Sequence, residues 1–163
     1  MSKFEELCAA YGGVKHEYDT YRHECMAFVG TLVAGLRDYL EAPEGFVNLF
    51  AKGGSFAGRK VDGPAAAMHM GDDTFWHFGI AIDLFEESNQ MPMHCVGFDM
   101  RLKKVGHKFI LHVEGGPPFE LTKENPDRLA PLYEFIFQFI KGRYENSFSE
   151  FVIKGDASRR FGF

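Results

Sequence analysis

The chain has 163 residues, 45% of them hydrophobic, and a formal net charge of −5 at pH 7. This size and composition suit one folded domain rather than a disordered or fibrous protein. The acidic balance argues against a nucleic-acid partner, because affinity for phosphate backbones comes from lysine and arginine side chains. No apolar run is long enough to span a bilayer, so we expect no membrane partner either.

Cysteine usage indicates the compartment. Cys8, Cys25 and Cys95 are widely spaced and odd in number, which fits neither a disulfide framework nor a metal-binding knuckle. The N-terminus carries acidic residues where a signal peptide would carry a basic run. We therefore expect a cytoplasmic protein with reduced thiols and without a cofactor or metal.

Phenylalanine is unusually frequent, with 18 residues in the chain. An excess of aromatic side chains predicts either a very aromatic core or rings at a protein interface. We therefore predict a homodimer that associates through aromatic surface.

The first predicted elements are helices. Ser2 and Glu5 have the spacing of a capping box, which predicts a short helix over about residues 3–11 that the glycine pair 12–13 ends. Apolar residues at helical spacing predict a second, long helix over residues 16–40.

After Pro43 the hydrophobic period changes to two, which is typical of strands. The predicted strands cover residues 46–52, 64–70, 74–86, 91–104, 107–114 and 117–122. Short links between them favour an antiparallel meander. Pro126 then suits the first position of a long apolar helix, with Asn125 as its N-cap, and Pro131 can delay the helix start.

These elements predict a single α+β domain over residues 1–163. An antiparallel meander of about five or six strands packs on the N-terminal helices and a long C-terminal helix. The predicted parts are a helical part over residues 1–42, a sheet over 46–122, a C-terminal helix over 126–150 and a tail over 155–163.

The stretch GGSFAGRK, residues 53–60, comes close to a phosphate-binding loop. Arg59 stands where that loop needs lysine, and Lys60 stands where it needs the serine or threonine that holds magnesium. Gly63 and Pro64 also interrupt the helix that should follow. We predict no nucleotide site, and leave open that Arg59 and Lys60 close over an anionic ligand.

The central strands predict one apolar face and one polar face. The predicted polar face comprises His77, Gly79, Ala81, Asp83, Cys95, Gly97, Asp99, Arg101, Lys108, Ile110, His112 and Glu114. A turn centred on Asn89 would set Gly79 beside Asp99, and a turn centred on residues 105–106 would set Asp99 beside His112.

An Asp99–His112 pair would have a chemical use. A carboxylate that accepts from one ring nitrogen raises the basicity of the other, giving a general base near neutral pH. Arg101 would bind negative charge, and Gly79 and Gly97 would leave room above the sheet. Cys95 lies near a carboxylate that raises its pKa, so we do not expect a nucleophilic thiol.

Two functions follow from this face. The first is a small binding or regulatory protein whose ligand-binding residues are His77, Gly79, Gly97, Arg101 and Glu114. Its target is a protein partner or a small ligand, for which Arg101 favours an anion. The alternative is a hydrolase- or isomerase-type enzyme with His112 and Asp99 as catalytic residues.

Two further interpretations of the same side chains need no small organic ligand. A purely structural Asp99–His112 pair would be covered by other residues. A metal site built from His77, Asp99 and His112 would be spread over three strands, so no metal is predicted.

Overall fold

The computed structural model describes residues 1–51, 60–86, 93–122 and 126–154. The strands are β1 (Val47–Phe50), β2 (His69–Met70), β3 (Trp76–Phe85), β4 (Met93–Val105), β5 (Lys108–Val113) and β6 (Pro118–Thr122). The helices are α1 (Lys3–Tyr39), α2 (Pro64–Ala67), the 3-10 helix η1 (Pro126–Leu129), α3 (Ala130–Glu145) and α4 (Ser147–Lys154). The predicted α+β class is confirmed.

The strands form one antiparallel sheet in the order β1-β3-β4-β5-β6, and β2 pairs with β3 beside this path. The strands from β3 to β6 therefore follow one another as the predicted meander. The strand β1 pairs with β3 at the other edge. Short links between consecutive strands make this the simplest antiparallel arrangement.

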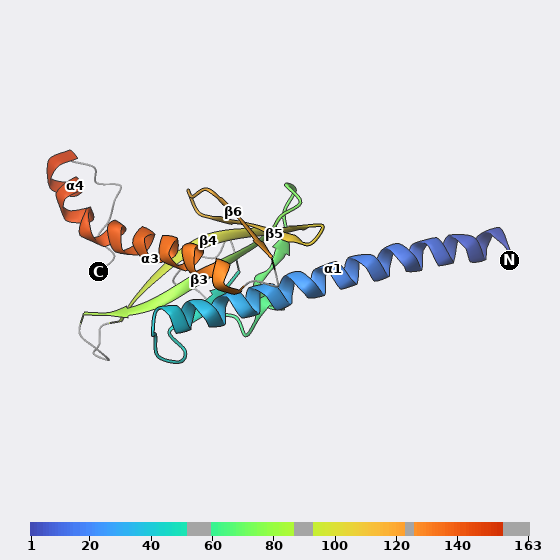
Figure 1. Ribbon diagram of the computed structural model, residues 1–163, viewed down its shortest axis with the longest axis horizontal. Coiled ribbons are helices and arrows are strands. Elements are labelled where there is room, and N and C mark those ends of the chain that lie inside the picture. The colour runs from blue at the N-terminus through green and yellow to red at the C-terminus, as the bar shows by residue number, and fades with distance from the viewer. Residues whose placement is uncertain (52–59, 87–92, 123–125, 155–163) are drawn as a thin grey trace.

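Figure 1 shows α1 and α3 lying side by side across the sheet. The Tyr133 hydroxyl on α3 donates to the Leu32 carbonyl on α1 at 3.2 Å, and Phe28 on α1 stacks on Phe109 of β5 with ring centroids 4.1 Å apart. The most deeply buried side chains of the sheet are Phe78, Ile80, Phe98, Met100, Leu102, Phe109 and Leu111. The apolar face predicted from the alternation is therefore the face that the helices cover.

The predicted break between two N-terminal helices is wrong, because α1 runs unbroken from Lys3 to Tyr39. The capping box of Ser2 and Glu5 at its start is confirmed. A glycine ends a helix when it adopts the left-handed conformation. The pair 12–13 keeps helical geometry instead, at a cost of about 1 kcal/mol for each glycine relative to alanine.

Two other predicted elements are corrected. Residues 64–70 form the helical turn α2 before the short strand β2, because Pro64 at the first helical position is followed by three alanines. The predicted helix over 126–150 is divided into η1, α3 and α4, and Pro131 lies in the first turn of α3 as expected. Asn125 and the tail 155–163 lie outside the described residues. None of the described helices is both long and apolar enough to cross a membrane.

Candidate functional site

The register between β3 and β4 is the predicted one. His77 lies opposite Arg101 and Gly79 lies opposite Asp99. The turn centred on Asn89, from which this register was predicted, lies outside the described residues. The polar residues of these two strands therefore share one face of the sheet, as the alternation indicated.

The register between β4 and β5 differs from the prediction by two residues. Arg101 lies opposite His112, and the Asp99 carbonyl accepts from the Glu114 N–H at 3.0 Å. The turn lies between Val105 and Lys108, with Gly106 as its first residue at φ +61°. Tight hairpins often need a positive φ at this position, which glycine adopts freely and a β-branched residue such as valine does not.

The shifted register separates the predicted acid–base pair. Asp99 lies one row away from His112, and among the described residues no hydrogen bond joins them, so this prediction is wrong. Phe75 instead places its ring edge-on to the His112 imidazole, at 5.5 Å between ring centroids. Burial, and then the positive charge of Arg101, lower the pKa of His112 below its ordinary value of 6.5. This direction is opposite to that expected from a carboxylate partner.

A pocket of about 540 Å³ lies over this part of the sheet. Its lining residues are His77, Asp99, Met100, Arg101, His112, Val113, Glu114, Gly115 and Gly116. Three of them, His77, Arg101 and His112, form a single row across β3, β4 and β5. The structure thus brings together five of the predicted site residues: His77, Asp99, Arg101, His112 and Glu114.

The two predicted glycines do not line this pocket. The Phe50 ring occupies the space above Gly79, so that a Cβ added there would collide with it. Gly97 is buried. The open space predicted above Gly79 is therefore filled by a neighbouring strand, since an aromatic ring packs well over a glycine in a sheet.

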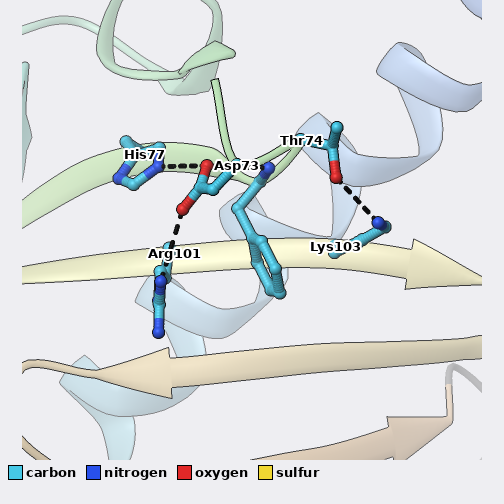
Figure 2. A network of polar contacts seen from close by, with 6 residues as sticks. Asp73, Thr74, His77, Arg101 and Lys103 are labelled. Atoms are coloured by element: carbon cyan, nitrogen blue, oxygen red, sulfur yellow. Dashed lines mark hydrogen bonds and ion pairs between the residues drawn. The ribbon is translucent and has the colours of Figure 1, made fainter. Parts of the chain in front are cut away.

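Sequence reasoning missed Asp73, which holds two residues of the row in place (Figure 2). Its carboxylate contacts His77 Nε2 at 2.8 Å and Arg101 Nη1 at 3.3 Å. It also accepts from the Phe75 N–H at 3.1 Å. The hydrogen bond with His77 is the main reason why the pKa of Asp73 falls from 3.8 to about 2. The Gly-Asp-Asp motif that contains Asp73 indicated a turn, and nothing in it indicated these partners.

Phe75 completes the support of Arg101. The Arg101 guanidinium carbon lies 5.2 Å from the centre of the Phe75 ring, a distance typical of a cation–π contact. Lys103 approaches the same ring at 5.6 Å and donates to Thr74 Oγ1 at 2.7 Å. Thr74 adopts φ +66°, which is uncommon for a threonine. The turn before β3 is therefore tied to β4 through several side chains.

The Asp73 contacts predict a difference at acid pH. Because the pKa of Asp73 is lower in the folded protein than its ordinary value, this carboxylate stabilises the fold above about pH 4, and the contribution is lost as pH falls toward 2. We expect the melting temperature of Asp73→Asn to fall less steeply over this pH interval than that of the unmodified protein. Circular dichroism would measure both melting temperatures. The difference should be small, since the carboxylate is exposed.

Asp72→Asn is the matched control for this experiment, because Asp72 is the exposed neighbour on the same turn. It should follow the unmodified protein through the whole titration. Equal slopes for Asp73→Asn and the unmodified protein would contradict the contacts assigned to Asp73.

The glycine-rich loop contributes one described residue. Residues 53–59, including Arg59, lie outside the described residues, while the Lys60 ammonium contacts the buried Asp83 carboxylate at 2.6 Å. Lys60 is therefore engaged by the protein itself. The pKa of Cys95 is raised by burial and then by Asp83, in the predicted direction, so its thiol is a poor nucleophile.

A second hollow, of about 530 Å³, lies where the end of α1, β3 and α3 meet. Its walls are mainly apolar, with Phe46, Phe85, Phe137, Ile140 and Tyr144 among them. Glu41, Asp83, Lys141 and Glu145 also line it, but none of the predicted site residues does. We therefore regard the polar pocket over β3, β4 and β5 as the candidate site.

Within the described part of the chain, no group of three or more histidine, cysteine or acidic residues is placed to hold a metal ion. Comparisons of the chain with protein-family models, with curated proteins and with solved structures found no match.

Proposed function

We propose that this chain is a small cytoplasmic binding protein that takes a small anionic ligand in the polar pocket. One observation supports this above the others: Arg101 lies between His77 and His112 in a single row across three strands of the pocket. A row of nitrogen donors on strands is held more rigidly than one on loops, which favours a binding role.

Arg101 is suited to bind a carboxylate or phosphate group. Asp73 contacts its Nη1 at 3.3 Å, and a guanidinium carries five N–H donors in a fixed fork. The Phe75 ring restrains the same side chain from one side. A restrained arginine loses less conformational entropy when a ligand binds, so more of the interaction energy appears as affinity.

His112 supplies a neutral partner to the ligand. Because its pKa lies below the ordinary value, the imidazole is uncharged near pH 7 and offers one donor and one acceptor. A bound anion would offset the charge of Arg101 and favour the protonated ring. Binding should therefore raise the pKa of His112, which gives a direct readout of occupancy.

The carboxylates of Asp99 and Glu114 also line the pocket. They would repel a ligand with several negative charges and accept hydrogen bonds from hydroxyl or amino groups. The preferred ligand is therefore a small molecule with one acidic group and neighbouring donors. A nucleic-acid backbone does not fit this description.

The observed register removes the main argument for the alternative enzymatic function. It required Asp99 to orient His112 as a general base, and the two residues lie in different rows. We therefore propose binding without acid–base catalysis by this pair.

A titration with lactate, which carries one carboxylate and a neighbouring hydroxyl group, tests the proposal. We expect saturable NMR shifts of the Arg101 side chain and the His112 ring, together with a rise in the pKa of His112. Arg101→Ala should weaken binding by at least about tenfold, because charge-assisted hydrogen bonds are lost. Without ligand, the same substitution should also raise the pKa of His112.

Arg22→Ala is the matched control, since Arg22 is an exposed arginine on α1 that does not line the pocket. It should leave the titration unchanged. Shifts that never saturate, or that persist equally in Arg101→Ala, would contradict an anion site at this pocket.

We further propose that the protein is a homodimer, as the abundance of phenylalanine predicted. The exposed apolar residues of α1 support this part of the proposal, and the surface involved is derived in the next subsection.

A further inference from the structure

The first half of α1 carries exposed large apolar residues at alternating intervals of three and four positions. These residues, which we call the N-terminal seam, are Phe4, Leu7, Tyr11, Val14 and Tyr18, and they are between 47% and 73% exposed. Intervals of three and four are the heptad spacing by which one helix packs along another. A helix surface with this pattern is typical of a helix–helix contact.

The same series continues into the folded body. Its next members are Tyr21, Cys25, Phe28 and Leu32, and the last three of these are buried. Phe28 stacks on Phe109, and the Tyr21 hydroxyl accepts from the backbone N–H of Lys104 at 3.3 Å. The sheet therefore covers the second half of the series and leaves most of the N-terminal seam uncovered; at its inner end the Tyr18 ring lies 6.5 Å from the Trp76 ring. Figure 1 shows this part of α1 extending well beyond the sheet.

The extended segment has little to hold it as a helix on its own. Every residue from Met1 to Thr20 is exposed, and Gly12 and Gly13 destabilise a helix relative to alanine. The exposed ion pair of Lys15 and Asp19, at 2.8 Å, adds little to the stability of the helix. In proteins, most of the stability of a helix comes from tertiary packing rather than from intrinsic propensity. A partner that covers the seam would supply that packing.

We propose that a second copy of this chain covers the N-terminal seam, with the two segments antiparallel about a twofold axis. A partner helix in the parallel direction would follow the seam past Tyr18 into the space that Phe109 and the rest of the sheet fill. An antiparallel partner instead directs its own sheet toward the opposite end of the contact. The same surface is then used by both copies, as a twofold dimer requires.

One register uses the whole N-terminal seam. Tyr11 packs against the partner's Val14, Leu7 against the partner's Tyr18, and Phe4 against the partner's Tyr21. In the first two of these pairs an aromatic ring faces an aliphatic side chain, so large and smaller side chains alternate and fill the space between the helices. A shift by one heptad toward the N-termini would pair Tyr18 with no residue of the seam.

The charges beside the seam are compatible with this register. Cys8 lies beside the partner's Lys15, and Ala10 lies beside the partner's Glu17, so no like charges meet at these flanks.

With roughly 100 Å² for each exposed side chain, the contact buries on the order of 1,000 Å² in total, which a specific interface needs. The inference deepens the homodimer part of the proposed function and is independent of the ligand pocket.

Analytical ultracentrifugation of the full chain, with and without Val14→Glu, tests the seam. We expect a dimer for the unmodified protein and an increase of at least about 100-fold in the dimer dissociation constant for the variant, because an unpaired charge would be buried twice. Val14 is 68% exposed in the protomer, so the variant should retain the melting curve of the folded body. His16→Glu, on the outer face of the same helix, should remain a dimer.

Cross-linking tests the direction. Lys15→Cys would place its thiol beside the partner's Cys8, so oxidation should give a covalent dimer on a non-reducing gel. His16→Cys, whose thiol points away from the partner, and the unmodified chain should give none.

Three results would contradict the proposed antiparallel dimer. The first is an unmodified chain that stays monomeric at about 100 µM, far above the dissociation constants usual for specific dimers; this result would also remove the homodimer proposal. The second is a dimer that Val14→Glu does not weaken, which would keep the homodimer and move its surface elsewhere. The third is a dimer sensitive to Val14→Glu in which Lys15→Cys fails to cross-link, which would exclude the antiparallel register. None of these results bears on the anion titration.

Discussion

Phe109→Ala is expected to lower the free energy of unfolding by about 3–5 kcal/mol, the usual cost of removing a buried phenylalanine. The Phe109 ring is only 2% exposed and stacks on Phe28 at 4.1 Å. It thus joins β5 to α1, and its loss leaves a cavity between the sheet and the helix that covers it. Urea unfolding followed by circular dichroism would measure the change.

Phe137→Ala provides the comparison. Phe137 is 38% exposed on α3, and removing its ring should cost less than about 1 kcal/mol, as for most surface changes. If the two substitutions cost the same, the assignment of Phe109 to the centre of the core would be wrong.

Gly35→Ala is expected to destabilise the protein by about 1–3 kcal/mol, although alanine is the better helix former. A Cβ at position 35 would collide with the Tyr133 hydroxyl on α3. That hydroxyl is fixed by its hydrogen bond to the Leu32 carbonyl at 3.2 Å, and burial raises the pKa of Tyr133 to about 12. The two helices would have to move apart to admit the methyl group.

Gly30→Ala is the matched control on the same helix. Within the described part of the chain, its added Cβ would have Pro64 Cγ as its nearest neighbour, at 3.9 Å, so we expect stabilisation by about 0.5–1 kcal/mol. Thermal unfolding would compare the two variants directly. A Gly35→Ala protein as stable as Gly30→Ala would show that the helices do not approach each other closely at this point.

A double substitution tests whether the collision with Tyr133 causes the destabilisation by Gly35→Ala. Tyr133→Phe removes the oxygen and costs about 1 kcal/mol for the lost hydrogen bond. When combined with Gly35→Ala it should also relieve the collision, so the double variant should lose less stability than the two single variants together. Simple additivity would argue against the collision as the cause.

The alternation of apolar and polar residues made much of the fold predictable. It identified the strands of the meander, the face that the helices cover and the side chains on the other face. Together with the short turn expected around Asn89, it also gave the register of β3 with β4, in which His77 faces Arg101. The alternation limits a strand to register shifts that keep each face intact, and the expected turn then selected one of them.

The same constraint explains the error at the next pair of strands. A shift of two residues leaves both faces unchanged, so hydrophobicity could not distinguish Asp99 beside His112 from Arg101 beside His112. The turn decided between them, because Gly106 takes the position that requires a positive φ. The contacts of Asp73 with His77 and Arg101 could not be predicted either, because the residues around position 73 show no pattern that indicates them.

By itself, the sequence determined the class of the fold, the composition of the polar face and the capped start of α1, since each depends on local periodicity or on neighbours along the chain. The tertiary structure decided which polar residues share a row, that Phe50 fills the space above Gly79, and that Asp73 supports Arg101. It also decided where the sheet stops covering α1, and so which apolar residues remain for a partner. These features depend on turns and on segments distant in sequence, whose relative positions only the folded chain defines.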